Sequence, residues 1–148
     1  MLDGTAEDRA EIDALVARFF AAFTNRGGAV PDVEGLAGLF IAGGVIVKAV
    51  GSDTEVYSVR DFIAPRLRLL TDGTLTDFRE AETQARTQIA GNVAQRVSLY
   101  EKSGVMAGAR IEGKGIKVLQ LVRTAAGWRL SAVAWDDARE GFAVPPRL

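Results

Sequence analysis

The residues with the clearest chemical potential lie at the end of a long apolar segment. Residues 115–137 read as two apolar strands joined by a tight turn, and they end in Trp135, Asp136 and Asp137. A carboxylate beside an apolar wall can act as a general acid or base because desolvation raises its pKa. Lys48 interrupts another apolar stretch, where it could anchor an anion or supply an amine with a lowered pKa. Acid–base or anchoring chemistry by these side chains is therefore the first hypothesis.

The chain contains no cysteine and no histidine, which narrows the chemistry further. These absences remove disulfides, thiolate nucleophiles and the side chain best suited to proton transfer near neutral pH. Zinc sites normally draw on the same residue types, so only a carboxylate site for a hard cation would remain. Asp136 and Asp137 cannot easily chelate one ion, because neighbouring strand residues point to opposite faces. We therefore expect no metal and no cofactor.

The composition is typical of a globular protein. Of the 148 residues, 48% are hydrophobic and 25% are charged, so we expect a single domain over residues 1–148. The net charge of −1 offers no basic surface for a phosphate backbone. The N-terminal residues are acidic, and no apolar run approaches the roughly 20 residues needed to cross a bilayer. A cytoplasmic protein that binds neither nucleic acid nor membrane is expected.

Three helices are predicted in the first half of the chain. A short helix over residues 32–40 has Asp32 as its cap and is ended by the glycines at 43–44. Another begins after Ser58, whose spacing from Asp61 is typical of a helix cap. The first and longest helix spans residues 6–23, where apolar side chains recur at the spacing of one helical face: Ile12, Leu15, Val16, Phe19, Phe20 and Phe23.

The rest of the chain is predicted to form a sheet. Strands are expected at residues 45–50, 76–89, 92–102, 115–123 and 128–137, with a Gly-rich loop between the third and the fourth. Glu, Gln and Arg alternate with small residues in the strand at 76–89, so one of its faces should be solvated. The last two strands are apolar on both faces, and helices can cover only one of them. A second subunit is the natural cover for the other, so we expect a homodimer through the sheet.

The order of these elements resembles the nuclear transport factor two-like (NTF2-like) superfamily, and within it the SnoaL-like or DUF4440-like branch. The segments that carry the resemblance are residues 36–40 leading into 44–47, the capped segment 57–62, and the Gly-Trp-Arg-Leu sequence at 127–130. The resemblance implies an α+β fold, in which a cone-shaped, curved antiparallel sheet wraps around three N-terminal helices. It also implies an apolar pocket for a small molecule between sheet and helices.

The chemistry known in this superfamily can be tested residue by residue. Ketosteroid isomerases place a tyrosine where this chain has Phe19, a base aspartate where it has Lys48, and an oxyanion-stabilising acid near Leu119, with Gln120 the closest polar neighbour. None of the three positions carries the required group. The dehydratases, and the cyclases with a His–Asp arrangement, need a histidine that is absent. The Asp-Arg-Asp set of the epoxide hydrolases could be assembled from Asp136 or Asp137 with Arg96 or Arg110.

Strand parity assigns the two terminal carboxylates to opposite faces. Asp136 shares the parity of Trp128 and Leu130, the apolar face expected against the helices, so it is predicted to point inward unless a bulge intervenes. Asp137 is then predicted to point away from the pocket. Asp136 is either a solvated or arginine-paired carboxylate at the rim, or the acid or base of the pocket. Lys48 is either a ligand anchor or reactive amine, or a salt-bridged or snorkelling lysine.

The remaining candidates are contact and wall residues. Polar contacts to a ligand could come from Tyr57, Arg96, Tyr100 and Gln120, although each is also consistent with an ordinary strand or interface residue. The aromatic candidates for core or pocket wall are Phe19, Phe23, Phe62 and Trp135, the last of which could instead lie at the dimer face.

Two functions fit these expectations. The first is a homodimer that binds a small molecule in an apolar pocket without the known catalytic residues of the superfamily. The second is an enzyme of isomerase, cyclase or hydrolase type in which Asp136 and Lys48 are catalytic. The absence of histidine and the replaced catalytic positions favour binding.

Overall fold

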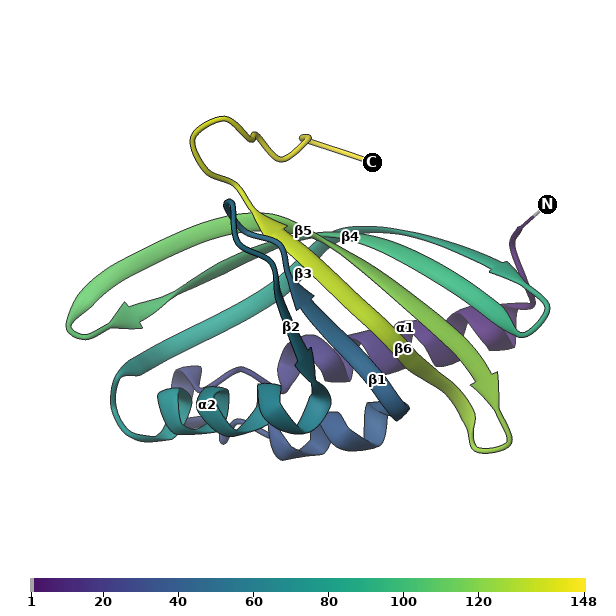
Figure 1. The fold of residues 1–148 in the computed structure, drawn as a ribbon, viewed down its shortest axis with the longest axis horizontal. Helices are drawn as coiled ribbons and strands as arrows, with labels where there is room; N and C mark the ends of the chain where they lie inside the picture. The colour runs from purple at the N-terminus through teal and green to yellow at the C-terminus, as the bar shows by residue number, and fades with distance from the viewer. Residues whose placement is uncertain (1) are drawn as a thin grey trace.

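A computed structural model describes residues 2–148 (Figure 1). The helical elements are α1 (Ala6–Ala21), η1 (Arg26–Gly28), η2 (Glu34–Leu39) and α2 (Val59–Thr71). The strands are β1 (Phe40–Lys48), β2 (Glu55–Ser58), β3 (Leu75–Ala90), β4 (Val93–Met106), β5 (Ala109–Thr124) and β6 (Gly127–Asp137). None of the helices within residues 2–148 has the length and apolar character required to span a bilayer.

The strands form one curved sheet in the order β2-β1-β6-β5-β4-β3, and the helices lie against its concave side (Figure 1). This confirms the α+β fold. Two details differ from the expectation. The sheet is antiparallel except for the parallel pair β1 and β6, and the second predicted helix is a short 3-10 helix, η2, whose first residue follows Val33 rather than Asp32.

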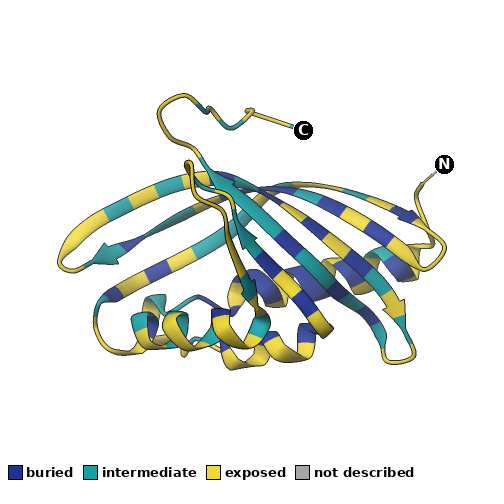
Figure 2. Ribbon diagram, viewed as in Figure 1, coloured by how far each residue is buried: buried dark blue, intermediate teal, exposed yellow. Residues whose placement is uncertain are grey.

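Helix α1 forms where its apolar periodicity predicts it. Thr5 caps the helix, because its hydroxyl accepts a hydrogen bond from the Asp8 amide at 3.0 Å. Asp8 also fixes the helix to the sheet, since its carboxylate accepts hydrogen bonds from Arg123 at 2.6 and 3.0 Å and from the indole of Trp128 at 3.1 Å. The buried face of α1 and the inner face of the strands make up the core (Figure 2).

Register shifts bend the long strands. In β6, Ala132 pairs with Gln120 but Leu130 pairs with Leu121, so Ser131 is an extra residue. In β3 the register shifts between Thr76 and Arg79 and again between Glu82 and Gln84. An extra residue bends and twists its strand, and it also reverses which face the following side chains occupy. These shifts account for part of the curvature that encloses the helices.

The predicted Gly-rich loop between residues 102 and 115 is instead the continuation of two paired strands. β4 and β5 run on to a turn at Ala107 and Gly108, both of which have positive φ. Gly104 sits in β4 because a Cβ there would lie 3.0 Å from the ring of Phe78. Glycine in this segment therefore marks close packing, not a loop. The first predicted strand is also longer, since β1 begins at Phe40 and runs through the two glycines at 43–44.

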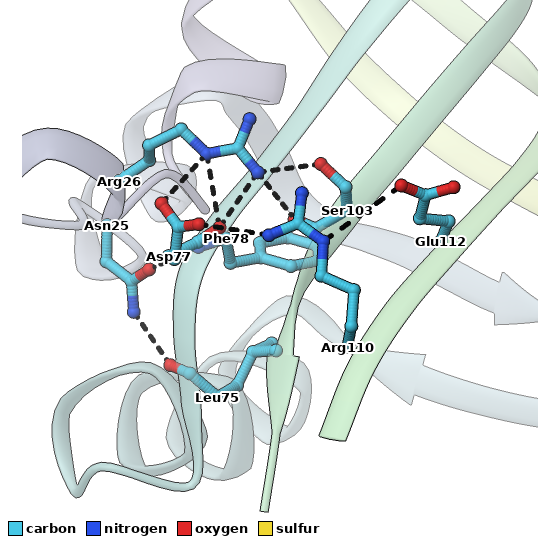
Figure 3. Close-up of polar contacts among 8 residues, drawn as sticks. All are labelled: Asn25, Arg26, Leu75, Asp77, Phe78, Ser103, Arg110 and Glu112. Atoms are coloured by element: carbon cyan, nitrogen blue, oxygen red, sulfur yellow. Dashed lines mark hydrogen bonds and ion pairs between the residues drawn. The ribbon is translucent and has the colours of Figure 1, made fainter. Parts of the chain in front are cut away.

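The chain after α1 is fixed to the sheet by the side chains of two residues (Figure 3). Asn25 donates to the carbonyls of Leu70 at 3.0 Å and Leu75 at 2.8 Å and accepts from the amide of Phe78 at 2.7 Å. Next to it, Arg26 donates to the Asp77 carboxylate at 3.1 Å and to the Ser103 hydroxyl at 2.7 Å. One asparagine thus joins the end of α1, the end of α2 and the start of β3.

We expect Asn25→Ala to lower the free energy of unfolding by about 2 kcal/mol, because it leaves partly buried backbone groups without partners. Asn92→Ala is the matched control, since Asn92 is exposed and accepts one side-chain bond, from Arg123 at 3.1 Å. The control substitution should lower the free energy of unfolding by less than about 0.5 kcal/mol. Urea unfolding of both variants measures the difference, and equal losses would contradict the role given to Asn25.

Candidate ligand-binding site

A cavity of about 280 Å³ lies between α1, α2 and the inner face of the sheet. Its wall is aromatic around Phe62, whose ring is edge-on to Phe23 at 6.1 Å and to Trp135 at 5.9 Å. The other apolar wall residues are Phe19, Leu69, Leu70, Leu75, Phe78, Met106 and Ile111. A larger hollow of about 670 Å³ lies over β3, β4 and β5, but it is lined by exposed charged side chains such as Arg79, Glu101 and Lys114. The smaller cavity, with its aromatic and aliphatic wall, is the better candidate site.

Six charged side chains line the same cavity, and their positive and negative charges do not balance. The cationic ones are Lys48, Arg66, Lys102 and Lys117, and the acidic ones are Glu80 and Asp137. Four positive charges against two negative ones leave a formal excess of two positive charges. An apolar cavity with this excess can attract and hold an anion.

Lys117 and Glu80 form a buried ion pair at 3.1 Å, with side chains that are only 6% and 10% exposed. The Lys117 ammonium also lies 3.9 Å from the ring centre of Tyr100 and 5.1 Å from that of Trp135. Burial lowers the pKa of Lys117, and the neighbouring Glu80 carboxylate opposes this effect. The net shift of the Lys117 pKa is downward.

Asp137 is the second inward carboxylate. It accepts a hydrogen bond from the Tyr100 hydroxyl at 2.5 Å and from Lys102 at 2.9 Å. Burial alone would raise the pKa of Asp137, but the bonds from Tyr100 and Lys102 outweigh it and the net shift is downward. Gly115 makes the approach possible, because a Cβ there would lie 2.2 Å from the Tyr100 oxygen. Burial, followed by the bond to Asp137, raises the pKa of Tyr100, so this residue remains a donor.

The two other cations, Lys48 and Arg66, are half-buried and differ from Lys102 and Lys117. Among residues 2–148, neither has a carboxylate within ion-pair distance. Arg66 instead stacks its guanidinium 4.0 Å from the ring centre of Phe62 and 5.3 Å from that of Tyr57. Both cations are thus free to pair with an anionic group in the cavity.

The other end of the concave face is closed by a separate polar cluster. Arg96, with 6% of its surface exposed, donates to Glu82 at 2.5 and 3.0 Å, to Asp13 at 2.5 Å and to Thr87 at 3.0 Å. Ser98 donates to the same Glu82 carboxylate. With its donors engaged within the protein, this cluster is structural.

Solved structures of other proteins have a similar fold. An NTF2-like protein with a cystatin-like fold from Novosphingobium aromaticivorans superposes with a TM-score of 0.68 at 21% identity, over 88% of this chain and 81% of that one. A cystatin-like-fold protein of unknown function from Nostoc punctiforme gives 0.69 at 19% identity, over 90% and 93%. This chain has the NTF2-like, cystatin-like fold.

A third structure, named as a candidate aromatic ring hydroxylase from Novosphingobium aromaticivorans, gives a TM-score of 0.72 at 18% identity, over 95% and 92% of the chains. No protein-family model matches the sequence, and no curated protein matches it. Identities this low establish the fold alone, so the assignment to the SnoaL-like or DUF4440-like branch stays a prediction.

The facing predicted for the two terminal carboxylates is wrong, and the bulge at Ser131 is the reason. Beyond the bulge, Trp135 and Asp137 point into the cavity between the helices and the sheet. Asp136 points to the other face, where its carboxylate is paired with Arg139. Lys48 is registered with Trp135 and lines the cavity. The structure therefore does not bring Asp136 and Lys48 together.

The predicted contact residues separate into two groups. Phe19, Phe23, Phe62 and Trp135 line the cavity, as does Lys48. The other four do not reach it. Tyr57 packs against Phe62 and donates a hydrogen bond to Glu55, and Arg96 belongs to the polar cluster. Tyr100 lies against Lys117 with 1% of its surface exposed. Gln120 is exposed beside Val93 and Ser131.

The sequence reading missed five polar residues of the cavity: Arg66, Glu80, Lys102, Lys117 and Asp137. A signal was present for Lys117, which shares the parity of Leu119 and Leu121 and must therefore face the core with them. In β3, Glu80 shares the parity of the buried Phe78, which likewise indicates that Glu80 faces the core. Within residues 2–148, no three acidic side chains gather closely enough to hold a metal ion.

Asp137 should make stability depend on pH. Because its pKa is lowered in the folded state, its contribution is complete well above the unfolded value of about 3.9 and is lost as the pH falls through the folded value. Between about pH 7 and about pH 3 we expect the wild type to lose more free energy of unfolding than Asp137→Asn. Urea titrations at each pH measure this, and parallel curves for the two proteins would contradict it.

Proposed function

We propose that this protein binds a small, largely apolar molecule that carries a carboxylate. The observation that carries the proposal is the excess of two positive charges in an aromatic cavity, where Lys48 and Arg66 have no carboxylate partner among residues 2–148. An apolar cavity favours the hydrocarbon part of a ligand, and the unpaired cations favour its anionic end. A volume of about 280 Å³ suits a molecule with a single ring or a short chain.

Binding without the isomerase mechanism of the superfamily is supported at the positions where that mechanism would operate. Phe19 and Lys48 line the cavity but carry no hydroxyl and no carboxylate there. Leu119 is fully buried in the core. The inward carboxylates, Glu80 and Asp137, are already held by Lys117 and Lys102. We therefore favour a ligand-binding role over the catalytic pairing of Asp136 with Lys48.

We expect 3-phenylpropanoate to bind in the cavity and Lys48→Met or Arg66→Met to weaken it roughly tenfold each, since each removes a charged contact to the carboxylate. Isothermal titration calorimetry measures the affinities. Arg86→Met is the matched control, because Arg86 is exposed on β3 and does not line the cavity. The neutral 3-phenylpropanamide should bind more weakly than the acid. Equal affinity for acid and amide would sink the proposal.

We also propose a homodimer formed through the outer face of the sheet. On this face Val118 is 41% exposed at the centre of β5, and Val93, at the start of β4, is 57% exposed opposite Val122. The C-terminal residues are held to the edge strand β3, where Gln84 donates to the Pro146 carbonyl at 2.9 Å. A twin copy would remove the exposed valines from water.

Sedimentation velocity tests the homodimer. We expect the wild type to sediment as a dimer at micromolar concentration and Val118→Glu to shift it to monomer, because an unpaired charge would be buried between the subunits. Val56→Glu is the control, since Val56 is 67% exposed on the edge strand β2, and it should leave the dimer intact. A monomeric wild type, or equal dissociation of both variants, contradicts the proposed interface.

A further inference from the structure

We propose that Lys117 forms a Schiff base with the carbonyl carbon of an oxo acid or aldehyde that enters the cavity. The inference rests on the proposed function for the oxo acid, because the carboxylate of that ligand would be held by Lys48 and Arg66. It goes beyond binding, since it assigns a covalent step and a nucleophile.

The geometry distinguishes Lys117 from the other amines. The chain has four lysines, at positions 48, 102, 114 and 117. Lys117 lines the cavity and is almost fully buried, with the Glu80 carboxylate 3.1 Å from its nitrogen. Tyr100 and Trp135 surround the amine with aromatic rings. An amine in apolar surroundings next to a proton acceptor is the arrangement that activates a lysine as a nucleophile.

The three other lysines lack one or more of these features. Lys102 is 28% exposed and so lacks the apolar surroundings of Lys117, and its partner Asp137, at 2.9 Å, already accepts a hydrogen bond from Tyr100. Lys48 lines the cavity but has no carboxylate at ion-pair distance to take its proton. Lys114 is exposed and lies outside the cavity. Burial of Lys117 also lowers its pKa, which adds support to the geometry.

The proposed step balances with the groups present. Lys117 transfers one proton to Glu80, and the nitrogen lone pair attacks the carbonyl carbon while the C=O electron pair moves to oxygen. One proton then passes from the attacking nitrogen to this oxygen, which gives a neutral carbinolamine. Glu80 then delivers its proton to the leaving hydroxyl, so that water departs and a C=N bond forms. The net change is an ammonium and a carbonyl converted to an iminium and water, with no oxidant or reductant.

Reductive trapping tests this step. The intact protein is incubated with phenylpyruvate and cyanoborohydride, and the modified lysine is located by peptide mass mapping. We expect one adduct per chain, at Lys117, with labelling roughly tenfold faster than at Lys114, which serves as an internal control. Lys114→Met, at a position outside the cavity, should be labelled at Lys117 like the wild type. Labelling spread evenly over the four lysines would overturn the proposal.

A second pair of measurements separates this proposal from the binding proposal. Lys117→Met combined with Glu80→Gln removes both members of the ion pair, so that no buried charge is left alone. This variant should lose the adduct and still bind 3-phenylpropanoate. Benzaldehyde, which has no carboxylate, should label Lys117 in the wild type even if 3-phenylpropanoate fails to bind. If 3-phenylpropanoate binds and neither carbonyl probe labels Lys117, the Schiff base proposal is wrong and the binding proposal stands.

Discussion

The extra residue at Ser131 is the constraint on which the cavity depends. Before it, Trp128 and Leu130 of β6 face the core against α1. After it, the facing of the strand is reversed, so Trp135 and Asp137 point inward. A continuous strand would have presented Ala134 and Asp136 to the cavity instead. The place of Trp135 in the aromatic wall and the bond from Tyr100 to Asp137 both follow from this single irregularity.

Charge is the second organising feature of the concave face. Burying the Lys117–Glu80 pair costs desolvation energy that its attraction only partly offsets, and apolar residues of similar size would often be at least as stable. A buried pair at the cavity wall is therefore better explained by a use for the amine or the carboxylate than by stability. The Arg96 cluster, away from the cavity, has the features of a structural network, because its guanidinium is satisfied by Glu82, Asp13 and Thr87.

Sequence reasoning reached the fold and the aromatic wall but not the polar half of the site. The periodicity of α1 and the four long strands are strong local signals, and the phenylalanines of the helices follow from them. The bulge in β6 is not a local signal, because it is defined by pairing with β5. Side-chain parity counted as if β6 were continuous predicts that Asp136 faces inward and Asp137 outward, which is the reverse of the structure. The β3–Lys117 contact brings together residues distant in sequence, so Glu80 read as solvated although Phe78 shares its parity.

A crystal structure of the protein grown with 3-phenylpropanoate tests the central claim. That claim is that the extra residue in β6 turns Trp135 and Asp137 inward and so builds a cationic, aromatic cavity for a carboxylate ligand. The account predicts the phenyl ring beside Phe62 and Trp135, the carboxylate within hydrogen-bond distance of Lys48 or Arg66, and Asp137 facing inward. A strand without the extra residue at Ser131, with Asp136 in the cavity, would contradict it. So would a cavity that stays empty while the ligand binds elsewhere.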